Sequence, residues 1–322
     1  MDREPEFVDD SETFTAEQVE SILHVTSYHR RQFEYRVIHF NPEQHDGIRT
    51  SIFKPFTSIS SCSSPLWKLP IELWSSILPL LDISSVLQFS HVSLRARELV
   101  TGMKECRDLG EHAIECLCAI FRCSIASRIG IAQLYNALIT ENCAVCNKFG
   151  GFVYLPTVTR CCFLCLGGTS RSRTVSLIKL SRAMGISVPQ LRAGMPVVHS
   201  IPGVYGRHEE LLRLREQLVS EEHALAALRE AGIKMAHFDL KTSPGHTAGS
   251  HMCSSSLPYL NLLSGDVETG LFCRGCQNAV ESGRDFAQRM TLMRSRDWAY
   301  SKAGFIEHFR QCNKARELWA SS

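Results

Sequence analysis

The chain has 322 residues, of which 44% are hydrophobic and 21% are charged, a composition typical of a folded globular protein. This length is sufficient for two or three domains of modest size, each with a core of its own. The formal net charge of +2 excludes a strong overall attraction to nucleic acid or to an anionic membrane.

The chain contains fourteen cysteines, so the compartment in which it folds decides their chemistry. The first residues, Met1 to Glu6, are acidic and lack the basic-then-apolar order of a signal peptide. The longest apolar run, Ile77 to Ile83, contains Pro79 and Asp82 and is shorter than the about 18 residues of a membrane span. We therefore expect a soluble intracellular protein, cytoplasmic or nuclear, whose cysteines bind metal or are buried.

One amphipathic helix is predicted near the amino terminus. Thr15 to Gln18 has the sequence of a capping box, and apolar residues follow at helical spacing from Val19. The serine-rich stretch from Ser58 to Pro65 indicates a linker. Residues 1–64 are expected to form this helix and linker.

Three short helices are predicted between Leu66 and Met103. Pro70 suits the first turn of a helix, where a missing N–H is not needed. Asp82 or Ser84 can cap the second helix, and the third begins near Ser93. Four apolar residues of the first helix share one face: Leu73, Ile77, Leu78 and Leu81.

The order of residues in this segment resembles that of the F-box proteins. The shared positions are Leu69, Pro70, Glu72, Leu73, Ile77, Leu78, Leu81, Asp82, Leu87, Ser90, Val92, Ser93 and Arg97. The resemblance implies a three-helix module, expected at residues 65–105, that docks on the Skp adaptor of a cullin–RING ubiquitin ligase. It also implies which residues lie in or beside the adaptor interface: Leu69, Pro70, Ile77, Leu78 and Leu81.

Two positions depart from the family pattern. Ala96 stands where the family often has tryptophan, and Pro79 lies where the first helix should continue. A proline inside a helix costs about 3 kcal/mol, so the first helix is expected to end or kink there. The alternative interpretation of the whole segment is an ordinary helical hairpin inside a larger core.

The next segment, Arg107 to Ala137, is interpreted as helix because apolar residues recur in it at helical spacing. Four cysteines lie along it without a C-x-x-C pair or a histidine partner, and we interpret them as buried small hydrophobes: Cys106, Cys116, Cys118 and Cys123.

Two C-x-x-C pairs follow, with the ligand set Cys143, Cys146, Cys162 and Cys165. This spacing is typical of a structural zinc site, in which two knuckles hold one tetrahedral ion and leave no position open for chemistry. Cys161 is the alternative to Cys162, although it breaks the two-residue spacing. Four reduced buried thiols, or a redox-active pair, are the other interpretations of this motif.

The residues between the two pairs are expected to form a small β module at residues 140–168. Gly150 and Gly151 are expected to adopt positive φ where the chain leaves the first knuckle. The strand formers Phe152 to Leu155 should then pair with the chain that returns through Val158 and Arg160.

The stretch after Gly168 is basic, which we interpret as a solvated face. Glu209 to Ala231 is predicted to be one helix lined with leucines and ended by Gly232. Thr242 to Ser256 is polar and rich in glycine and serine, and we expect a mobile loop there. Three residues of that loop are a weaker metal-site candidate because their spacing is irregular: His246, His251 and Cys253.

A second candidate zinc site lies near the carboxy terminus, with the ligand set Cys273, Cys276, His308 and Cys312. Phe305 to Cys312 is predicted to be helical, which places His308 and Cys312 on one face. Phe305 and Phe309 are expected to pack beneath the metal or in the core. The long insertion between the two halves keeps open the alternative of a surface histidine near a half-buried cysteine. We place this second module at residues 270–315.

The expected fold is therefore mainly α with small β zinc modules: an amino-terminal three-helix F-box-like unit, followed at residues 106–322 by a zinc-stabilised helical region. F-box-like helices combined with Cys-knuckle pairs and a final His-x3-Cys also resemble a large group of fungal F-box proteins. These features favour a non-catalytic, substrate-recruiting ligase subunit that binds a Skp-type adaptor and a target protein. The alternative is a zinc-containing nucleic-acid-binding or transcriptional regulator, which the near-neutral charge disfavours. Hydrolase, P-loop and dinucleotide fingerprints are absent from the sequence.

Overall fold

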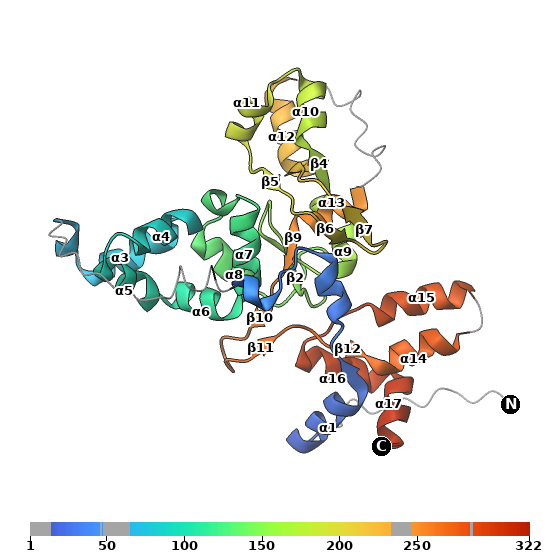
Figure 1. The fold of residues 1–322 in the computed structure, drawn as a ribbon. Helices are drawn as coiled ribbons and strands as arrows, with labels where there is room; N and C mark the ends of the chain where they lie inside the picture. The colour runs from blue at the N-terminus through green and yellow to red at the C-terminus, as the bar shows by residue number, and fades with distance from the viewer. Residues whose placement is uncertain (1–13, 46, 48–64, 233–245, 284–285) are drawn as a thin grey trace. The chain divides into compact units, whose positions relative to one another are not determined.

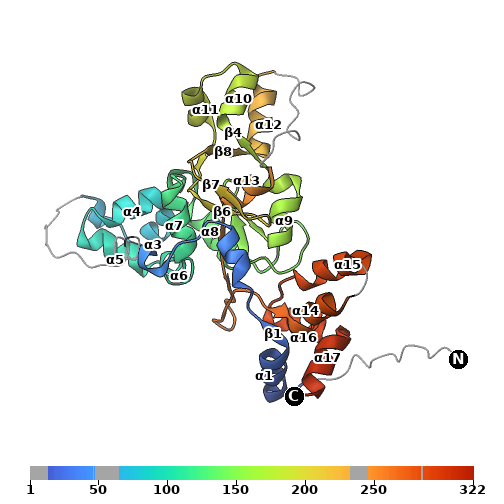
Figure 2. The same cartoon turned by 45° about the vertical axis from the view of Figure 1, so that its right-hand side comes forward.

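The computed structural model describes residues 14–45, 47, 65–232, 246–283 and 286–322. The chain divides into two compact units (Figures 1 and 2). Unit 1 combines Met1–His29 with Leu271–Ser322, and unit 2 comprises Arg30–Gly270. Helices predominate over small sheets, as predicted. Among the described residues, no helix combines the length and apolar character that crossing a membrane requires.

Unit 1 is built from both ends of the chain. Its elements are α1 (Ala16–Thr26), β1 (Ser27–Tyr28), β12 (Phe272–Cys273), α14 (Arg274–Ser282), α15 (Phe286–Arg296), α16 (Lys302–Gln311) and α17 (Asn313–Ala320). The predicted capping box is confirmed, because Thr15 Oγ1 accepts from the N–H of Gln18 and Gln18 Oε1 accepts from the N–H of Thr15. β1 pairs antiparallel with β12, and Ile22 of α1 is fully buried among residues of the carboxy-terminal helices.

The helical part of unit 2 begins with the predicted three-helix segment. Its elements are a 3₁₀ turn (Pro65–Lys68), α3 (Ile71–Ile77), a second 3₁₀ turn (Leu78–Leu80), α4 (Ile83–Ser90) and α5 (Leu94–Gly102). Asp82 and Ser93 cap α4 and α5 through their side chains, as expected. At Pro79 the α-helical geometry gives way to the 3₁₀ turn, because a proline has no N–H to donate. Most of the expected linker at 58–65 lies outside the described residues.

Three further helices share the core of this segment: α6 (Lys104–His112), α7 (Ile114–Arg122) and α8 (Ile131–Leu138). The single helix predicted from Arg107 to Ala137 is therefore wrong. The chain leaves helical geometry at Ala113 and again at Ser124, whose φ of +59° is left-handed. The four cysteines predicted to be buried here are all buried: Cys106, Cys116, Cys118 and Cys123.

In the part of unit 2 that the structure describes, the remaining chain forms four small sheets. The first has the order β3-β2-β9 and the second β4-β8-β5, and two hairpins pair β6 with β7 and β10 with β11. The strands are β2 (Phe152–Tyr154), β3 (Thr159–Cys161), β4 (Thr174–Ser176), β5 (Val198–His199), β6 (Gly203–Tyr205), β7 (Glu210–Leu212), β8 (Gln217–Ser220), β9 (Ser254–Ser256), β10 (Tyr259–Leu260) and β11 (Val267–Glu268). The helices among them are α9 (Phe163–Gly168), α10 (Leu177–Met184), α11 (Val188–Gly194), α12 (Glu221–Glu230) and α13 (His246–Met252).

The long helix predicted from Glu209 to Ala231 is wrong in its first half. Residues 210–212 form β7 and residues 217–220 form β8, and only α12 is helical, beginning after its cap Ser220. Glu209 has a φ of +56°, and Leu218 is buried in the central strand of the β4-β8-β5 sheet. Pairing with distant strands therefore overrides the local helical spacing of the leucines. Gly232 ends α12 with a φ of +71°, as predicted.

The mobile loop expected from Thr242 to Ser256 is also wrong for the described part, residues 246–256. α13 and β9 are ordered elements there, and β9 forms an edge of the first sheet against β2. Ser254 is fully buried, and its hydroxyl donates to the carbonyl of Ser250. Because sheet pairing and this bond satisfy its polar groups, a serine-rich segment can be buried.

Candidate metal centres

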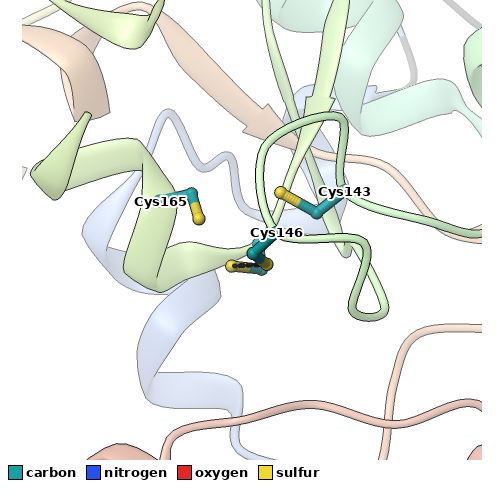
Figure 3. A group of neighbouring side chains, drawn as sticks. Cys143, Cys146 and Cys165 are labelled. Atoms are coloured by element: carbon teal, nitrogen blue, oxygen red, sulfur yellow. Dashed lines mark hydrogen bonds between the residues drawn. The ribbon is translucent and has the colours of Figure 1, made fainter. Parts of the chain in front are cut away.

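The first cysteine set comes together at one point in unit 2. The Sγ atoms of the four residues all lie within 4.8 Å of one another: Cys143, Cys146, Cys162 and Cys165. Figure 3 shows Cys143 and Cys146 on a loop that faces the helix bearing Cys165. The Sγ atoms of Cys146 and Cys162 are 3.7 Å apart. This group can hold a metal ion, as the spacing predicts.

Main-chain hydrogen bonds shape the first knuckle. The N–H of Val145 points toward the Sγ of Cys143 at 3.4 Å, and the N–H of Cys143 donates to the carbonyl of Lys148 at 2.7 Å. β2 pairs with β3 in the register Phe152↔Cys161, which confirms the predicted hairpin. The second pair lies at a helix start, where Cys162 is the N-cap of α9.

The expected role of Gly150 and Gly151 is wrong, since neither has a positive φ. In this knuckle Asn147 takes the left-handed conformation, with a φ of +56°. Gly150 is needed for close packing, because a Cβ there would lie 3.0 Å from the Cγ of Arg160 and 3.2 Å from the N of Cys143.

Cys162 and not Cys161 belongs to the metal group, as the two-residue spacing predicted. Hydrogen bonds from Cys161 and Cys162 hold the pKa of Cys143 well below its usual range, and the same contacts raise the pKa values of Cys161 and Cys162. Burial raises the pKa of Cys165 to about 12. Thiolates packed this closely repel one another, so the group can lose all its protons only beside a cation.

The second set lies in unit 1, where the ligand atoms of its four residues also fall within 4.8 Å of one another: Cys273, Cys276, His308 and Cys312. The Sγ of Cys312 is 3.8 Å from that of Cys273 and 3.9 Å from that of Cys276. The Nε2 of His308 lies 3.4 Å from the Sγ of Cys276. This group can hold a second metal ion.

Local structure explains how this second set forms. Cys273 ends β12 and caps α14 by accepting from the N–H of Cys276 at 3.4 Å. His308 lies in the last turn of α16, and Cys312 is its C-cap, so the predicted one-sided placement holds. Phe305 and Phe309 are buried in the same core cluster as Cys273 and Cys276, so they pack in the core next to two of the ligands.

Tyr300 orients the histidine, a role that the sequence did not reveal. Its ring stacks on that of His308 with centroids 4.5 Å apart, and its hydroxyl is 3.2 Å from Nδ1. Such a contact fixes the ring so that Nε2 faces the thiols. Burial alone would lower the pKa of His308, but hydrogen bonds and charge interactions with Cys273 and Cys312 raise it to about 9. Metal binding at neutral pH therefore has to displace a proton from His308.

A stability prediction follows from Gly275, which lies between two ligands of this site. A Cβ at this position would lie 2.4 Å from the N of Ala315 and 2.8 Å from its Cα, so Gly275→Ala should force α14 away from α17. We expect the variant to lose about 3 kcal/mol of unfolding free energy in denaturant titrations of the full chain. The control Gly194→Ala should be close to neutral, because a Cβ at Gly194 meets nothing within 4 Å. Equal stability of the two variants would contradict this packing.

The weaker metal candidate in the expected loop can be checked for two of its three residues, because the side chain of His246 lies outside the described part of the chain. Neither His251 nor Cys253 belongs to a metal-holding group in the described part of the chain, and the ring of His251 packs edge-on against Phe163. Both residues are buried. Burial against an aromatic ring is the structural role of His251.

The five residues placed at the adaptor interface by resemblance differ in exposure. Pro70 is exposed, Ile77 is partly exposed, and Leu69 and Leu81 are half-buried. Leu78 is only 1% exposed, so its side chain belongs to the core of unit 2. The buried face of α3 is rotated relative to the predicted one, since Trp74 is buried while Leu73 is exposed.

Comparisons with known proteins found no similar protein. No protein-family model, no curated protein and no solved structure matches this chain.

Proposed function

We propose that this protein is a non-catalytic, substrate-recruiting subunit of a Skp–cullin–F-box ubiquitin ligase, braced by two structural zinc ions. In this role the chain binds the Skp adaptor through α3 to α5 and presents a target protein with its remaining surface. Partners carry out ubiquitin transfer, and the chain raises the effective concentration of the target beside them.

The observation that carries the adaptor proposal is an exposed apolar surface on α3 and the 3₁₀ turn after it. The exposed fractions are 58% for Ile71, 47% for Leu73, 40% for Ile77 and 82% for Leu80. Single exposed apolar residues are ordinary, but four large ones within ten residues are typical of a protein interface.

Internal packing holds this surface in place. Trp74 of α3 is buried between the exposed residues Ile71 and Ile77 in the sequence, and its ring stacks on Phe89 of α4 with centroids 5.1 Å apart. Trp67 lies against both rings, at 6.0 Å and 6.2 Å. Ala96, which departs from the family pattern, is fully buried. The packed rings fix the position of α3, so the exposed apolar residues do not lose conformational freedom of the backbone when a partner binds.

Ligand chemistry and spacing support zinc as the metal. A tetrahedral zinc ion with Zn–S bonds of about 2.3 Å holds its sulfur ligands about 3.8 Å apart. The sulfur–sulfur distances of 3.7 Å in the first site and of 3.8 Å and 3.9 Å in the second agree with this value. Each set supplies four protein ligands, so a tetrahedral ion keeps no open position for a substrate, which supports a structural role.

The test is binding of the purified chain to a Skp adaptor. We expect the double variant Ile77→Asp/Leu80→Asp to lose about a thousandfold in affinity, since each buried apolar anchor is worth about 2 kcal/mol. The matched control is Ile178→Asp on α10, whose side chain is 52% exposed and lies outside the proposed surface. The control should bind as the unmodified chain does.

Two outcomes would contradict the proposal. If the unmodified chain does not bind an adaptor at micromolar concentration, the ligase role is lost. If the double variant binds as tightly as the control, α3 is not the docking element.

A further inference from the structure

A cleft of about 560 Å³ opens beside the first metal centre. One wall is the last two turns of α8, the second is the knuckle loop between Asn142 and Asn147, and the third is the returning chain from Val158 to Arg160. This volume lies within the range of about 300–1,000 Å³ that ligand-binding clefts occupy. One metal ligand, Cys143, is among the residues that line this cleft, whereas none of the residues of the adaptor surface is.

Apolar atoms supply most of the exposed lining of the cleft, and all but one of its polar side chains are uncharged. Six side chains carry a carboxamide or a hydroxyl: Gln133, Asn136, Thr140, Asn142, Asn147 and Thr159. Small apolar residues such as Ala144 and Val145 lie between them and leave the space open. Neither Asp nor Glu is among the residues that line the cleft.

The single charged residue of the lining is directed into the protein. Arg160 is 3% exposed, and its guanidinium donates to the main-chain carbonyls of Ala137, Leu257 and Pro258. Burial lowers the pKa of this group to about 10. Because these carbonyls accept from its Nη1 and Nη2, Arg160 joins α8 to the chain after β9 and is held in the protein beneath the cleft lining.

Three carboxamides of the lining have unused hydrogen-bonding capacity. The side chains of Asn136, Asn142 and Asn147 make no hydrogen bond to any group of the residues that the structure describes. A carboxamide offers both a donor and an acceptor, the same pair that a main-chain peptide group offers. Three such groups along one cleft are complementary to an extended peptide.

The knuckle wall depends on the metal centre. Ala144 and Val145 lie between the ligands Cys143 and Cys146, and the N–H of Ala144 donates to the carbonyl of Arg160 at 3.0 Å. A metal ion that fixes the two cysteines therefore also fixes the wall. Ligand binding in the cleft should weaken when the metal is removed.

We infer that this cleft binds a short, extended segment of a protein chain whose facing side chains are uncharged. This inference rests on the proposed function, in which the cleft would bind a segment of the target protein. A phosphorylated or acidic segment is disfavoured because the lining offers it no free cation. A sugar is disfavoured because aromatic rings, on which sugar faces stack, are missing from the residues that line the cleft.

The experiment uses the full zinc-loaded chain and a displayed random-peptide library as the probe. We expect selection of a consensus rich in uncharged polar and small residues, and we expect a synthetic peptide of that consensus to bind in calorimetry. Asn136→Lys should weaken its binding at least about tenfold, because a lysine at this wall brings an unpaired charge into the cleft. The matched control is Asn278→Lys, also an exposed helical asparagine but on α14, and it should bind normally.

Three results would overturn the inference. They are that no peptide is enriched, that Asn136→Lys and its control bind the consensus peptide equally well, or that the chain binds oligosaccharides on an array and no peptide. Removal of the metal by a chelator should also weaken peptide binding at least about tenfold, and undiminished binding would contradict the dependence on the knuckle. The Ile77→Asp/Leu80→Asp variant should bind the peptide normally. A chain that binds the peptide but not the adaptor would refute only the proposed ligase role.

Discussion

Replacing Cys165 by alanine is expected to lower the metal content of the purified chain from two ions to one and to unfold the segment that contains β2, β3 and α9. Alanine is the best helix former, so α9 itself does not suffer from the change. The loss comes from the metal. Structural zinc contributes about 10–16 kcal/mol of apparent binding free energy in zinc-finger peptides, whereas domains are stable by only about 5–15 kcal/mol.

Elemental analysis and hydrogen exchange over residues 143–168 measure this result. The matched control is Cys161→Ala, which removes a thiol that is 1% exposed and neighbours Cys143 but is not a member of the metal group. The control should keep two ions and lose only about 1 kcal/mol from the small cavity. Two ions in the Cys165→Ala variant, or one in the control, would mean that the ligand set is wrong.

Replacing His308 by alanine is expected to remove the other ion and to unfold unit 1, while the first site keeps its metal. Three thiolates remain, but the imidazole that Tyr300 orients through Nδ1 is lost. The most distinctive readout is α1, because Ile22 is fully buried in the same cluster as Cys273 and Phe305. Amide protection of residues 16–26 should therefore disappear after a substitution near the opposite end of the chain.

The controls for this variant separate metal loss from histidine loss. His24→Ala changes an exposed histidine on α1 of the same unit and should keep both ions and the protection of α1. His308→Cys should restore metal binding, because a fourth thiolate completes a tetrahedral set. Full protection of α1 in His308→Ala would show that the second group does not stabilise unit 1.

Acidification should release the metal ions before it unfolds the rest of the chain, because protons compete for the thiolates and for His308. Without metal, the neighbouring cysteines raise the pKa of His308 to about 9 in the folded chain. Protonation of His308 therefore stabilises the metal-free fold at pH values below the pKa that His308 has in the unfolded chain. This stabilisation is lost as the pH rises through about 9. With metal bound, stability is instead lost as the pH falls, because protons displace the ion. A titration monitored with a zinc-sensitive dye should therefore show release of zinc when the pH is lowered.

Local patterns in the sequence predicted the features that depend on neighbouring residues. Thr15, Asp82 and Ser93 cap helices as expected, since a cap needs only the next three residues. The two ligand sets were predicted for a similar reason, because short spacings such as C-x-x-C nearly determine how two thiolates meet.

Features that depend on distant partners were missed. Leu218 has helical spacing from its neighbours, yet it lies in β8 because β4 and β5 pair with that strand. The apolar face of α1 was evident, but not that carboxy-terminal helices cover it. Tyr300 was missed because a lone tyrosine before a helix gives no sign that it will stack on a ligand.

Cap signals and helical spacing placed the three helices between Leu66 and Met103 correctly, but the spacing assigned the wrong residues of the first helix to its buried face. Trp74 and Leu78 form the buried pair at i and i+4, whereas Leu73 and Ile77 remain exposed in part. An aromatic partner in α4, Phe89, decides this rotation. Leucine spacing alone cannot distinguish the two faces, since both carry apolar residues.

Native mass spectrometry of the full chain, purified with zinc and without chelators, tests the central claim most directly. We expect one dominant species with two zinc ions per chain, which loses one ion in Cys165→Ala and one in His308→Ala. A chain that carries no zinc, or that keeps both ions in either variant, would contradict it.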